Sequence, residues 1–324
     1  MADFVDRVGI EVPVVQAGMG GGVAGPRLAA AVSEAGGLGT LGMAAPASLT
    51  RQLTAARDLT DRPLAVNLLL PFARAAHWRA ASAADVVVTF WGTPRRQHGG
   101  TWIHQAGSVD EARAAHHAGA DAVIVQGVEA GGHVRGVLPA RDLLEQVRAV
   151  LPRDCPVLLA GGTADADDVT RALAAGADAA VAGTRFLMSE ESGATAGYKQ
   201  RLVDGSATVL TELFGVGWPG AHRVLPNDAT RRWLRRDPRG PGVVRLLNRA
   251  TRPVLSRSPD SAQAWMLRHQ AVGVPFFSPT PPAGNVPDRI LETSPLYAGE
   301  TVARIHQIAP AASIVRHLAG LDKR

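Results

Sequence analysis

The chain has 324 residues, of which 46% are hydrophobic and 19% are charged. This balance is typical of an ordinary globular protein and excludes a disordered or fibrous chain. A chain of this length buries a substantial core and suits one large domain, alone or with an appendage.

Three features of the sequence bear on where the protein resides. No apolar run approaches the roughly 18 to 20 residues that a membrane span needs, and the first residues lack the order of a secretory signal. The single cysteine, Cys155, cannot form an internal disulfide. Its place at the start of an apolar run predicts a buried strand-edge residue rather than a nucleophile. We therefore expect a cytoplasmic protein that has no membrane partner.

The net charge of +5 comes from arginine, since only Lys199 and Lys323 are lysines. The arginines are concentrated between Arg231 and Arg257. A nucleic-acid interface needs a basic face with stacking aromatics or a known reader motif, and this segment has one tryptophan and no such motif. We expect a solvated basic surface and no nucleic-acid partner, with an anionic substrate or partner as the alternative.

Short apolar runs alternate with alanine-rich stretches of helical spacing in the first part of the chain. The apolar runs, which predict strands, cover residues 13–19, 38–42, 63–70, 85–91, 101–107, 121–127, 156–162 and 178–186. Predicted helices cover residues 26–37, 72–82, 108–120 and 165–176, and two more begin near Pro46 and after Pro139.

The apolar runs are nearly continuous instead of alternating, which indicates strands that are buried on both faces and therefore parallel. Eight strand–helix units in one series predict an α/β fold, a closed (β/α)₈ TIM barrel, over residues 1–192. Residues 193–293 break this rhythm and predict a small, mainly helical lid domain after the eighth strand. Residues 294–324 predict a C-terminal helix, interrupted near Pro310, that packs back on the barrel.

Glycines follow the seventh and eighth predicted strands, at the barrel end where such folds carry their chemistry. They are Gly161, Gly162 and Gly183, and the hydroxyl of Thr184 follows directly. Glycines let backbone N–H groups approach an anion closely, and this is where barrels commonly seat a phosphate. A pair of glycines is also a plain turn, but two such sites after adjacent strands favour phosphate binding.

Two amides stand at the same barrel end. Asn67 lies in an apolar strand and Gln126 ends another, and a buried amide without a partner costs about 1–3 kcal/mol. Each amide makes either a structural hydrogen bond or a contact with a flat heteroaromatic ring or its ribityl chain.

His133 follows Gly131 and Gly132 in the loop after the sixth predicted strand. A histidine at the mouth of the barrel acts as a general base or as a partner of a substrate anion. The alternative is a loop histidine that only caps a helix. No set of histidines has a spacing typical of a metal site, so we expect no metal.

Several segments resemble the FMN-dependent nitronate monooxygenases. They are "PVVQAGMGGGVAGPRLAAAVSEAGGLGTLG", "LAVNLLLP", "VVVTFWGTP", "VIVQGVEAGGHVRG", "VLLAGGTAD" and "AAVAGTRF", which occur in the order of that family and cover most of the first 190 residues. The "EAGGH" run is the most specific of them. The resemblance implies bound FMN and makes His133 the active-site histidine.

The same resemblance assigns the cofactor-binding residues by position. It places the FMN phosphate at the glycine sites and the flavin ring and ribityl chain at the other segments of the mouth. The residues are Gly18, Met19, Asn67, Gln126, Gly131, Gly161, Gly162, Val181, Ala182, Gly183 and Thr184.

The implied activity is the oxidation of an alkyl nitronate, or of a nitroalkane, by O₂ to a carbonyl compound and nitrite. An FMN-dependent NAD(P)H:quinone reductase or enoyl-ACP-type reductase on the same barrel is the alternative. A barrel that binds a phosphorylated metabolite without redox chemistry is the third reading, and the oligomeric state, a homodimer among the options, stays open.

Two segments depart from the family pattern. The connection at residues 92–100 is too short for the usual helix, so we expect a more open mouth beside the fourth strand. The segment "TELFGVGWPGAHRVLPN" is unlike the corresponding family segment, which leaves the substrate contacts of the lid undefined.

Overall fold

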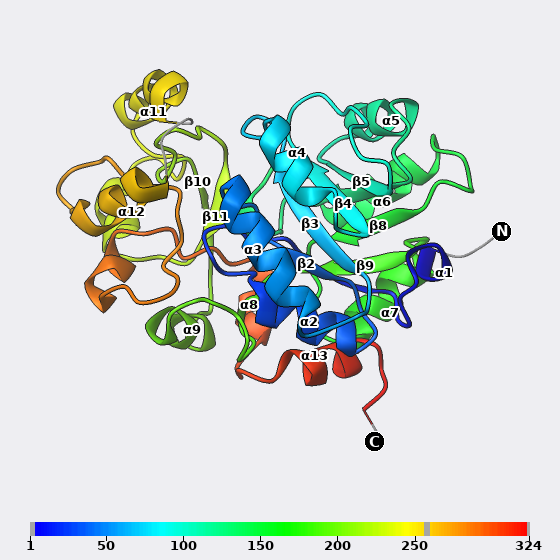
Figure 1. Cartoon of the computed structure of the whole chain (residues 1–324). Coiled ribbons are helices and arrows are strands. Elements are labelled where there is room, and N and C mark those ends of the chain that lie inside the picture. The colour runs from blue at the N-terminus through cyan, green and yellow to red at the C-terminus, as the bar shows by residue number, and fades with distance from the viewer. Residues whose placement is uncertain (1–3, 256–259, 323–324) are drawn as a thin grey trace.

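The structure, a computed structural model, describes residues 4–255 and 260–322. Eight parallel strands form one sheet in the order β1-β9-β8-β6-β5-β4-β3-β2. The strands are β1 (Val14–Gln16), β2 (Gly39–Leu41), β3 (Leu64–Leu69), β4 (Val86–Phe90), β5 (Thr101–Ala106), β6 (Ala122–Gln126), β8 (Val157–Ala160) and β9 (Ala179–Ala182). The two edges of the sheet meet at Leu38, whose N–H donates to the Val14 oxygen at 3.0 Å and whose oxygen accepts from the Gln16 N–H at 2.9 Å. The predicted (β/α)₈ barrel is confirmed (Figure 1).

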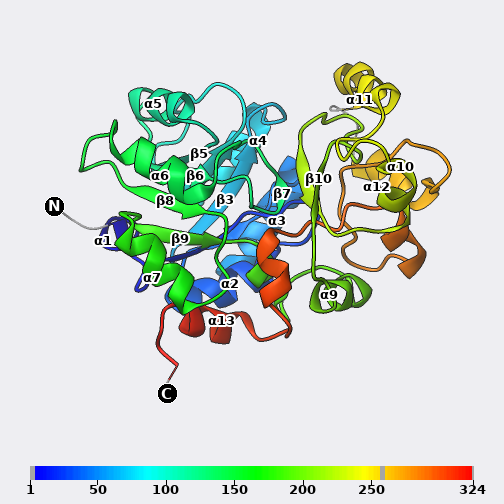
Figure 2. The ribbon, with the colours of Figure 1, turned by 180° about the vertical axis from the view of Figure 1, so that it is seen from behind.

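Helices cover the outside of the barrel (Figures 1 and 2). They are α2 (Pro26–Glu34), α3 (Pro46–Arg57), α4 (Ala75–Ala81), α5 (Val109–His117), α6 (Ala140–Arg148) and α7 (Ala166–Ala174). Among the described residues, none between β4 and β5 is helical, as the short connection predicts. A short helix, α8 (Thr184–Leu187), follows β9, and α13 (Ala311–Leu318) packs against α2 and α7 in the place of the eighth outer helix.

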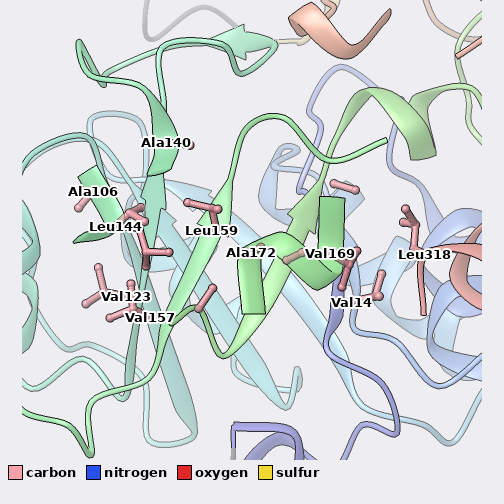
Figure 3. Close-up of a cluster of buried hydrophobic side chains, with 14 of the residues drawn as sticks. Val14, Ala106, Val123, Ala140, Leu144, Val157, Leu159, Val169, Ala172 and Leu318 are labelled. Carbon is pink, nitrogen blue, oxygen red and sulfur yellow. The ribbon is translucent and has the colours of Figure 1, made fainter. Parts of the chain in front are cut away.

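The strands separate two apolar layers because successive side chains point to opposite faces. In β8, Leu158 packs inside the barrel, whereas Val157 and Leu159 face the helices. Figure 3 shows this outer layer, in which Leu144 of α6 and Val169 of α7 lie beside the strands. Strands that bury both faces explain the continuous apolar runs of the sequence.

The helix α1 (Phe4–Val8) closes one end of the barrel. Phe4 and Val8 are buried and pack with the inner side chains of the strands. The segments at residues 196–255 lie at the opposite end, away from α1 (Figure 1). The mouth at the carboxyl ends of the strands is therefore the end that remains for a ligand.

The segments between α8 and α13, for which the sequence predicts a mainly helical lid, contain strands as well as helices, and we call them the lid. Their elements are α9 (Ala196–Val203), β10 (Val209–Thr211), β11 (His222–Val224), α10 (Asp228–Trp233), α11 (Gly242–Leu255), α12 (Asp260–His269) and the 3₁₀ helices η1 (Asp288–Glu292) and η2 (Glu300–Arg304). The strands β10 and β11 pair antiparallel with β7 (Gly132–His133), which belongs to a barrel loop. This sheet ties the lid to the loop that carries His133.

Two other predictions can be compared with the structure. Cys155 is buried and free, and burial raises the pKa of its thiol, which fits the structural role. The arginine-rich segment covers α10 and α11, with Arg257 outside the described residues. Among the described helices, none combines the length and the apolar character that a membrane crossing requires.

Candidate active site

A cavity of about 1060 Å³ opens at the carboxyl ends of the barrel strands. Small-molecule and cofactor sites usually have volumes of about 300–1,000 Å³, so this cavity has room for a cofactor and a second molecule. The barrel lines one side of it, and Val216, Trp218, Met266 and Pro279 line it from the lid.

Eleven of the twelve site residues predicted from the sequence line this cavity. They are Gly18, Met19, Asn67, Gln126, Gly131, His133, Gly161, Gly162, Val181, Gly183 and Thr184. The exception is Ala182, whose side chain packs in the outer apolar layer, because alternation in β9 turns Val181 inward and Ala182 outward.

The loops after β8 and β9 form a cradle of backbone N–H groups. The N–H groups of Gly162, Gly183 and Thr184 have no hydrogen-bond partner within residues 4–255 and 260–322. Gly161 and Gly162 have φ values of +118° and +84°, a backbone conformation that glycine adopts at little cost. Unpaired N–H groups at the wall of a cavity suit an anionic group such as a phosphate.

Segments far along the chain hold this cradle in place. The Gly299 N–H donates to the Thr184 hydroxyl oxygen at 2.9 Å. Arg304 donates to the Gly162 carbonyl at 3.1 Å and pairs with Asp165 and Asp168 at 2.9 and 2.7 Å. Arg304 and the N–H of Ala164 lower the pKa of Asp168 against the effect of burial, which raises it.

The loop after β1 meets β3 at very close range. The Asn67 amide nitrogen donates to the Gly18 carbonyl at 3.3 Å, and a Cβ atom on Gly18 would stand 2.3 Å from the Asn67 Cβ. Beside them, Thr40 of β2 lines the cavity with a buried hydroxyl oxygen that has no partner among the described residues. The sequence analysis did not identify Thr40, which reads as an ordinary strand residue.

Gln126 uses both ends of its amide within its own loop. Its nitrogen donates to the His133 carbonyl at 3.0 Å, and its oxygen accepts from the Arg135 N–H at 3.1 Å. Gly131 packs so closely on the next segment that a Cβ would stand 2.5 Å from the Gly299 nitrogen. These contacts fix the backbone on both sides of His133.

His133 lies in an aromatic enclosure at the cavity wall. Its ring stacks on Trp218 with centroids 3.4 Å apart and planes at 8°, and Tyr297 and His222 lie 5.5 and 5.3 Å away. Its Nε2 atom is buried and has no partner among the described residues. Burial, and to a lesser degree His222, lower the pKa of His133 well below the usual 6.5, so the ring is neutral near pH 7.

Trp91 directly follows β4, at the start of the short connection for which the sequence predicts a more open mouth. It has a φ of +64°, its ring meets Trp218 edge-on at 5.7 Å, and Arg135 lies over it at 4.9 Å. Sequence reasoning missed Trp91, Trp218, Tyr297 and His222 as site residues. Glycines and prolines beside the two tryptophans, in "FWGTP" and "GVGWPG", are the one local signal of constrained positions.

The site contains titratable groups but no cluster typical of a metal centre. Within the described residues, no group of three or more His, Cys, Asp or Glu side chains is arranged to hold a metal ion. The arrangement joins an anion cradle, an apolar chamber and a neutral histidine with an unpaired nitrogen. Such a site can hold a phosphorylated cofactor and accept a proton from a molecule beside it.

The chain is similar in sequence to known oxidoreductases. The family model for nitronate monooxygenase matches residues 3–102 and 86–271. The nitronate monooxygenase of Paraburkholderia phytofirmans is 30% identical over 72% of this chain and 78% of that protein. A (3aS,4S,5R,7aS)-5-hydroxy-7a-methyl-1-oxo-octahydro-1H-indene-4-carboxyl-CoA dehydrogenase of Rhodococcus jostii is 37% identical over 69% of this chain. The match covers 65% of the length of that dehydrogenase, less than two thirds.

Two solved structures resemble the whole chain. FabK from Thermotoga maritima has a TM-score of 0.76 and 29% identity, over 99% of this chain and 96% of that chain. The nitroalkane oxidase of Streptomyces ansochromogenes has a TM-score of 0.75 and 30% identity, over 98% of this chain and 96% of that chain.

Proposed function

The chain belongs to the nitronate monooxygenase family, and on that premise we propose that it is an FMN-dependent enzyme that oxidises alkyl nitronates with O₂. In the overall reaction two nitronates and one O₂ give two carbonyl compounds and two nitrites. Each carbon–nitrogen bond breaks, each oxygen atom of O₂ becomes one carbonyl oxygen, and each nitrogen leaves as nitrite. The observation that carries the proposal is the neutral His133 with its unpaired nitrogen at the wall of a cavity that also holds an anion cradle.

The residues of the cavity fit FMN. The unpaired N–H groups of Gly162, Gly183 and Thr184 suit its phosphate. The orphaned Thr40 hydroxyl and the Asn67 amide suit the polar atoms of the ribityl chain and ring. Bound flavin supplies the electron acceptor that takes electrons from the substrate and passes them to O₂.

The protein side of the chemistry falls to His133 and its surroundings. A nitronate is already an anion and needs no base, whereas a neutral nitroalkane must first lose its α-proton. A neutral imidazole can accept that proton. The apolar walls at Val216, Met266 and Pro279 exclude water and suit the alkyl part of the substrate.

The test is oxygen uptake by the FMN-saturated protein on addition of propionate 3-nitronate, without NAD(P)H. Uptake with release of nitrite supports the proposal, and no uptake from protein that holds flavin contradicts it. The role of His133 is tested by His133→Asn. We expect this variant to impair turnover of the neutral nitroalkane far more than that of the nitronate, and an equal loss on both would exclude the base assignment.

A second candidate is an FMN-dependent reductase or dehydrogenase that uses a pyridine nucleotide and acts on a quinone or an acyl thioester. The cavity of about 1060 Å³ lies at the upper limit of the usual size of ligand sites, which fits a large second ligand beside the cofactor. The similarity to a dehydrogenase of a carboxyl-CoA substrate supports it as well. Bleaching of the bound flavin by NADH or NADPH under anaerobic conditions separates this candidate from the first.

A further inference from the structure

A tight loop between Phe214 and His222 carries Trp218 near its middle, and the His222 ring ties both ends of this loop together. The Phe214 N–H donates to His222 Nε2 at 3.2 Å, and His222 Nδ1 lies 2.8 Å from the Gly220 oxygen. Because Nε2 accepts, the ring proton is on Nδ1, where it donates to Gly220. His222 is therefore a neutral ring with both nitrogens occupied by the backbone of the loop.

The same histidine is fixed against the loop that carries the active-site histidine. In the pairing of β11 with β7, His222 is the direct partner of His133. Their ring centroids are 5.3 Å apart. His222 therefore has two roles. Its two hydrogen bonds, which we call the clamp, hold the Phe214–His222 loop, and its backbone pairs with the strand that carries His133.

The Phe214–His222 loop places the Trp218 indole against one face of the His133 ring. Phe72 and Trp91 meet the indole edge-on at 5.3 and 5.7 Å, and the Gly217 N–H donates to Thr251 of α11 at 3.4 Å. These contacts leave the indole flat on the imidazole, with planes at 8°.

The loop has no room for a larger residue at its closest approach to the site. A Cβ on Gly220 would stand 2.9 Å from the Trp91 ring and 3.4 Å from His133 Cδ2. The backbone that accepts the hydrogen bond from His222 is therefore the backbone that borders His133. A shift of the clamp moves both Trp218 and the wall beside His133.

We propose that His222 is a positioning residue, which holds the Trp218 indole on His133 and thereby fixes the ring orientation of the active-site histidine and the burial of its Nε2 atom. This inference rests on the proposed function, in which His133 is the residue that accepts a proton from the substrate. His222 acts through the loop and Trp218 alone.

The first pair of variants separates the clamp from the bulk of the side chain. His222→Gln keeps one donor and one acceptor for the loop, whereas His222→Leu fills the space and loses both hydrogen bonds. The readout is the pKa of His133 from NMR titration of the histidine rings, assigned with His133→Asn. We expect His222→Leu to raise the His133 pKa toward its usual value by about one unit or more, since solvent reaches the ring. His222→Gln should raise it much less, because only the smaller direct effect of His222 on His133 is lost.

Fluorescence gives a second readout that does not depend on activity. The emission of Trp218 is obtained as the difference between each protein and its Trp218→Phe form. Acrylamide should quench this emission more strongly in His222→Leu than in the unchanged protein, because the indole becomes more accessible. Trp265→Phe is the matched control, because Trp265 also stacks on a histidine, His269, at 4.5 Å, but is 64% exposed on α12.

A double-mutant cycle completes the test. Trp218→Ala alone should raise the His133 pKa and lower kcat, and adding His222→Leu to it should change little more. If His222→Leu fails to fold, Trp218→Ala decides: an unchanged His133 pKa overturns the proposal. Full additivity of the two variants, or an unchanged pKa in folded His222→Leu, also overturns it. The NMR and fluorescence results do not depend on whether a nitronate is the substrate. The proposed function is tested separately, by the measurement of oxygen uptake.

Discussion

Gly18 and Asn67 lie in contact at the mouth of the barrel with no space between them for a methyl group. A Cβ on residue 18 would be 2.3 Å from the Asn67 Cβ and 2.9 Å from its amide nitrogen. The Asn67 amide in turn donates to the Gly18 carbonyl. Glycine is therefore required here by the neighbouring side chain, and not by its own backbone conformation.

Gly18→Ala should displace the Asn67 side chain and disturb the wall of the cofactor cavity. We expect a loss of about 1–3 kcal/mol in the free energy of unfolding, typical of overpacking, and at least tenfold weaker FMN binding. Urea unfolding and fluorescence titration with FMN measure the two effects. Gly20→Ala is the control from the same loop, since its Cβ would meet only the Met43 oxygen at 3.6 Å. Equal effects of the two variants would contradict the argument.

Arg304→Met should weaken FMN binding with little effect on overall stability. Arg304 is 45% exposed, so its pairs with Asp165 and Asp168 contribute roughly 1 kcal/mol or less to stability. Its bond to the Gly162 carbonyl, however, holds the cradle. We expect a several-fold higher Kd for FMN, measured by equilibrium dialysis. Arg171→Met is the control, because Arg171 also pairs with Asp168 but makes no hydrogen bond to the cradle within the described residues; it should retain the affinity.

The barrel was predictable because its strands are buried on both faces. Continuous apolar runs such as the one that forms β6 predict a buried strand from the local sequence alone. The antiparallel sheet of the lid had no such signal, since β7 is only the two residues Gly132–His133 and exists because β11 pairs with it. The replacement of the eighth outer helix by α13 also depends on packing between distant segments.

The residues of the candidate site also fall into those that the sequence predicts and those that it does not predict. The glycines of the cradle were predictable because each follows a strand, and position in a barrel determines which end a loop occupies. Trp91 and Trp218 were not, because their contact with His133 joins three separate segments. For Gln126 the sequence left two readings open, and the structure shows the structural hydrogen bonds to the loop of His133.

Thr184→Val should destabilise the junction between the cradle and the segment before η2. The valine removes the oxygen that accepts the buried Gly299 N–H, and an unpaired buried N–H costs about 1–3 kcal/mol. We expect a loss of that size in urea unfolding together with weaker FMN binding. Thr184→Ser keeps the acceptor and should lose much less, and a valine variant as stable as the unchanged protein would show that the hydroxyl does not matter.

Acid should destabilise the protein as the pH falls from about 6.5 toward 4, because burial lowers the pKa of several histidines, among them His104, His133 and His222. Burial lowers the pKa of His104 and of His222 to about 4, whereas a histidine in the unfolded chain titrates near 6.5. Between these values the unfolded state binds more protons, so stability is present above pH 6.5 and is lost as pH falls toward 4. Each histidine should contribute roughly 2 kcal/mol to the loss between pH 7.5 and pH 5.

His104 allows this linkage to be measured away from the active site. It lies on β5 and bonds to the Thr89 hydroxyl at 2.8 Å. Urea unfolding at pH 7.5 and at pH 5 gives the loss of unfolding free energy between the two pH values. This loss should be smaller by roughly 2 kcal/mol in His104→Gln than in the unchanged protein, because glutamine cannot bind the proton that His104 binds on unfolding. The urea m-value should stay constant between the two proteins, so that the comparison concerns stability alone. An unchanged pH dependence in the variant would mean that His104 is not kept neutral by its burial.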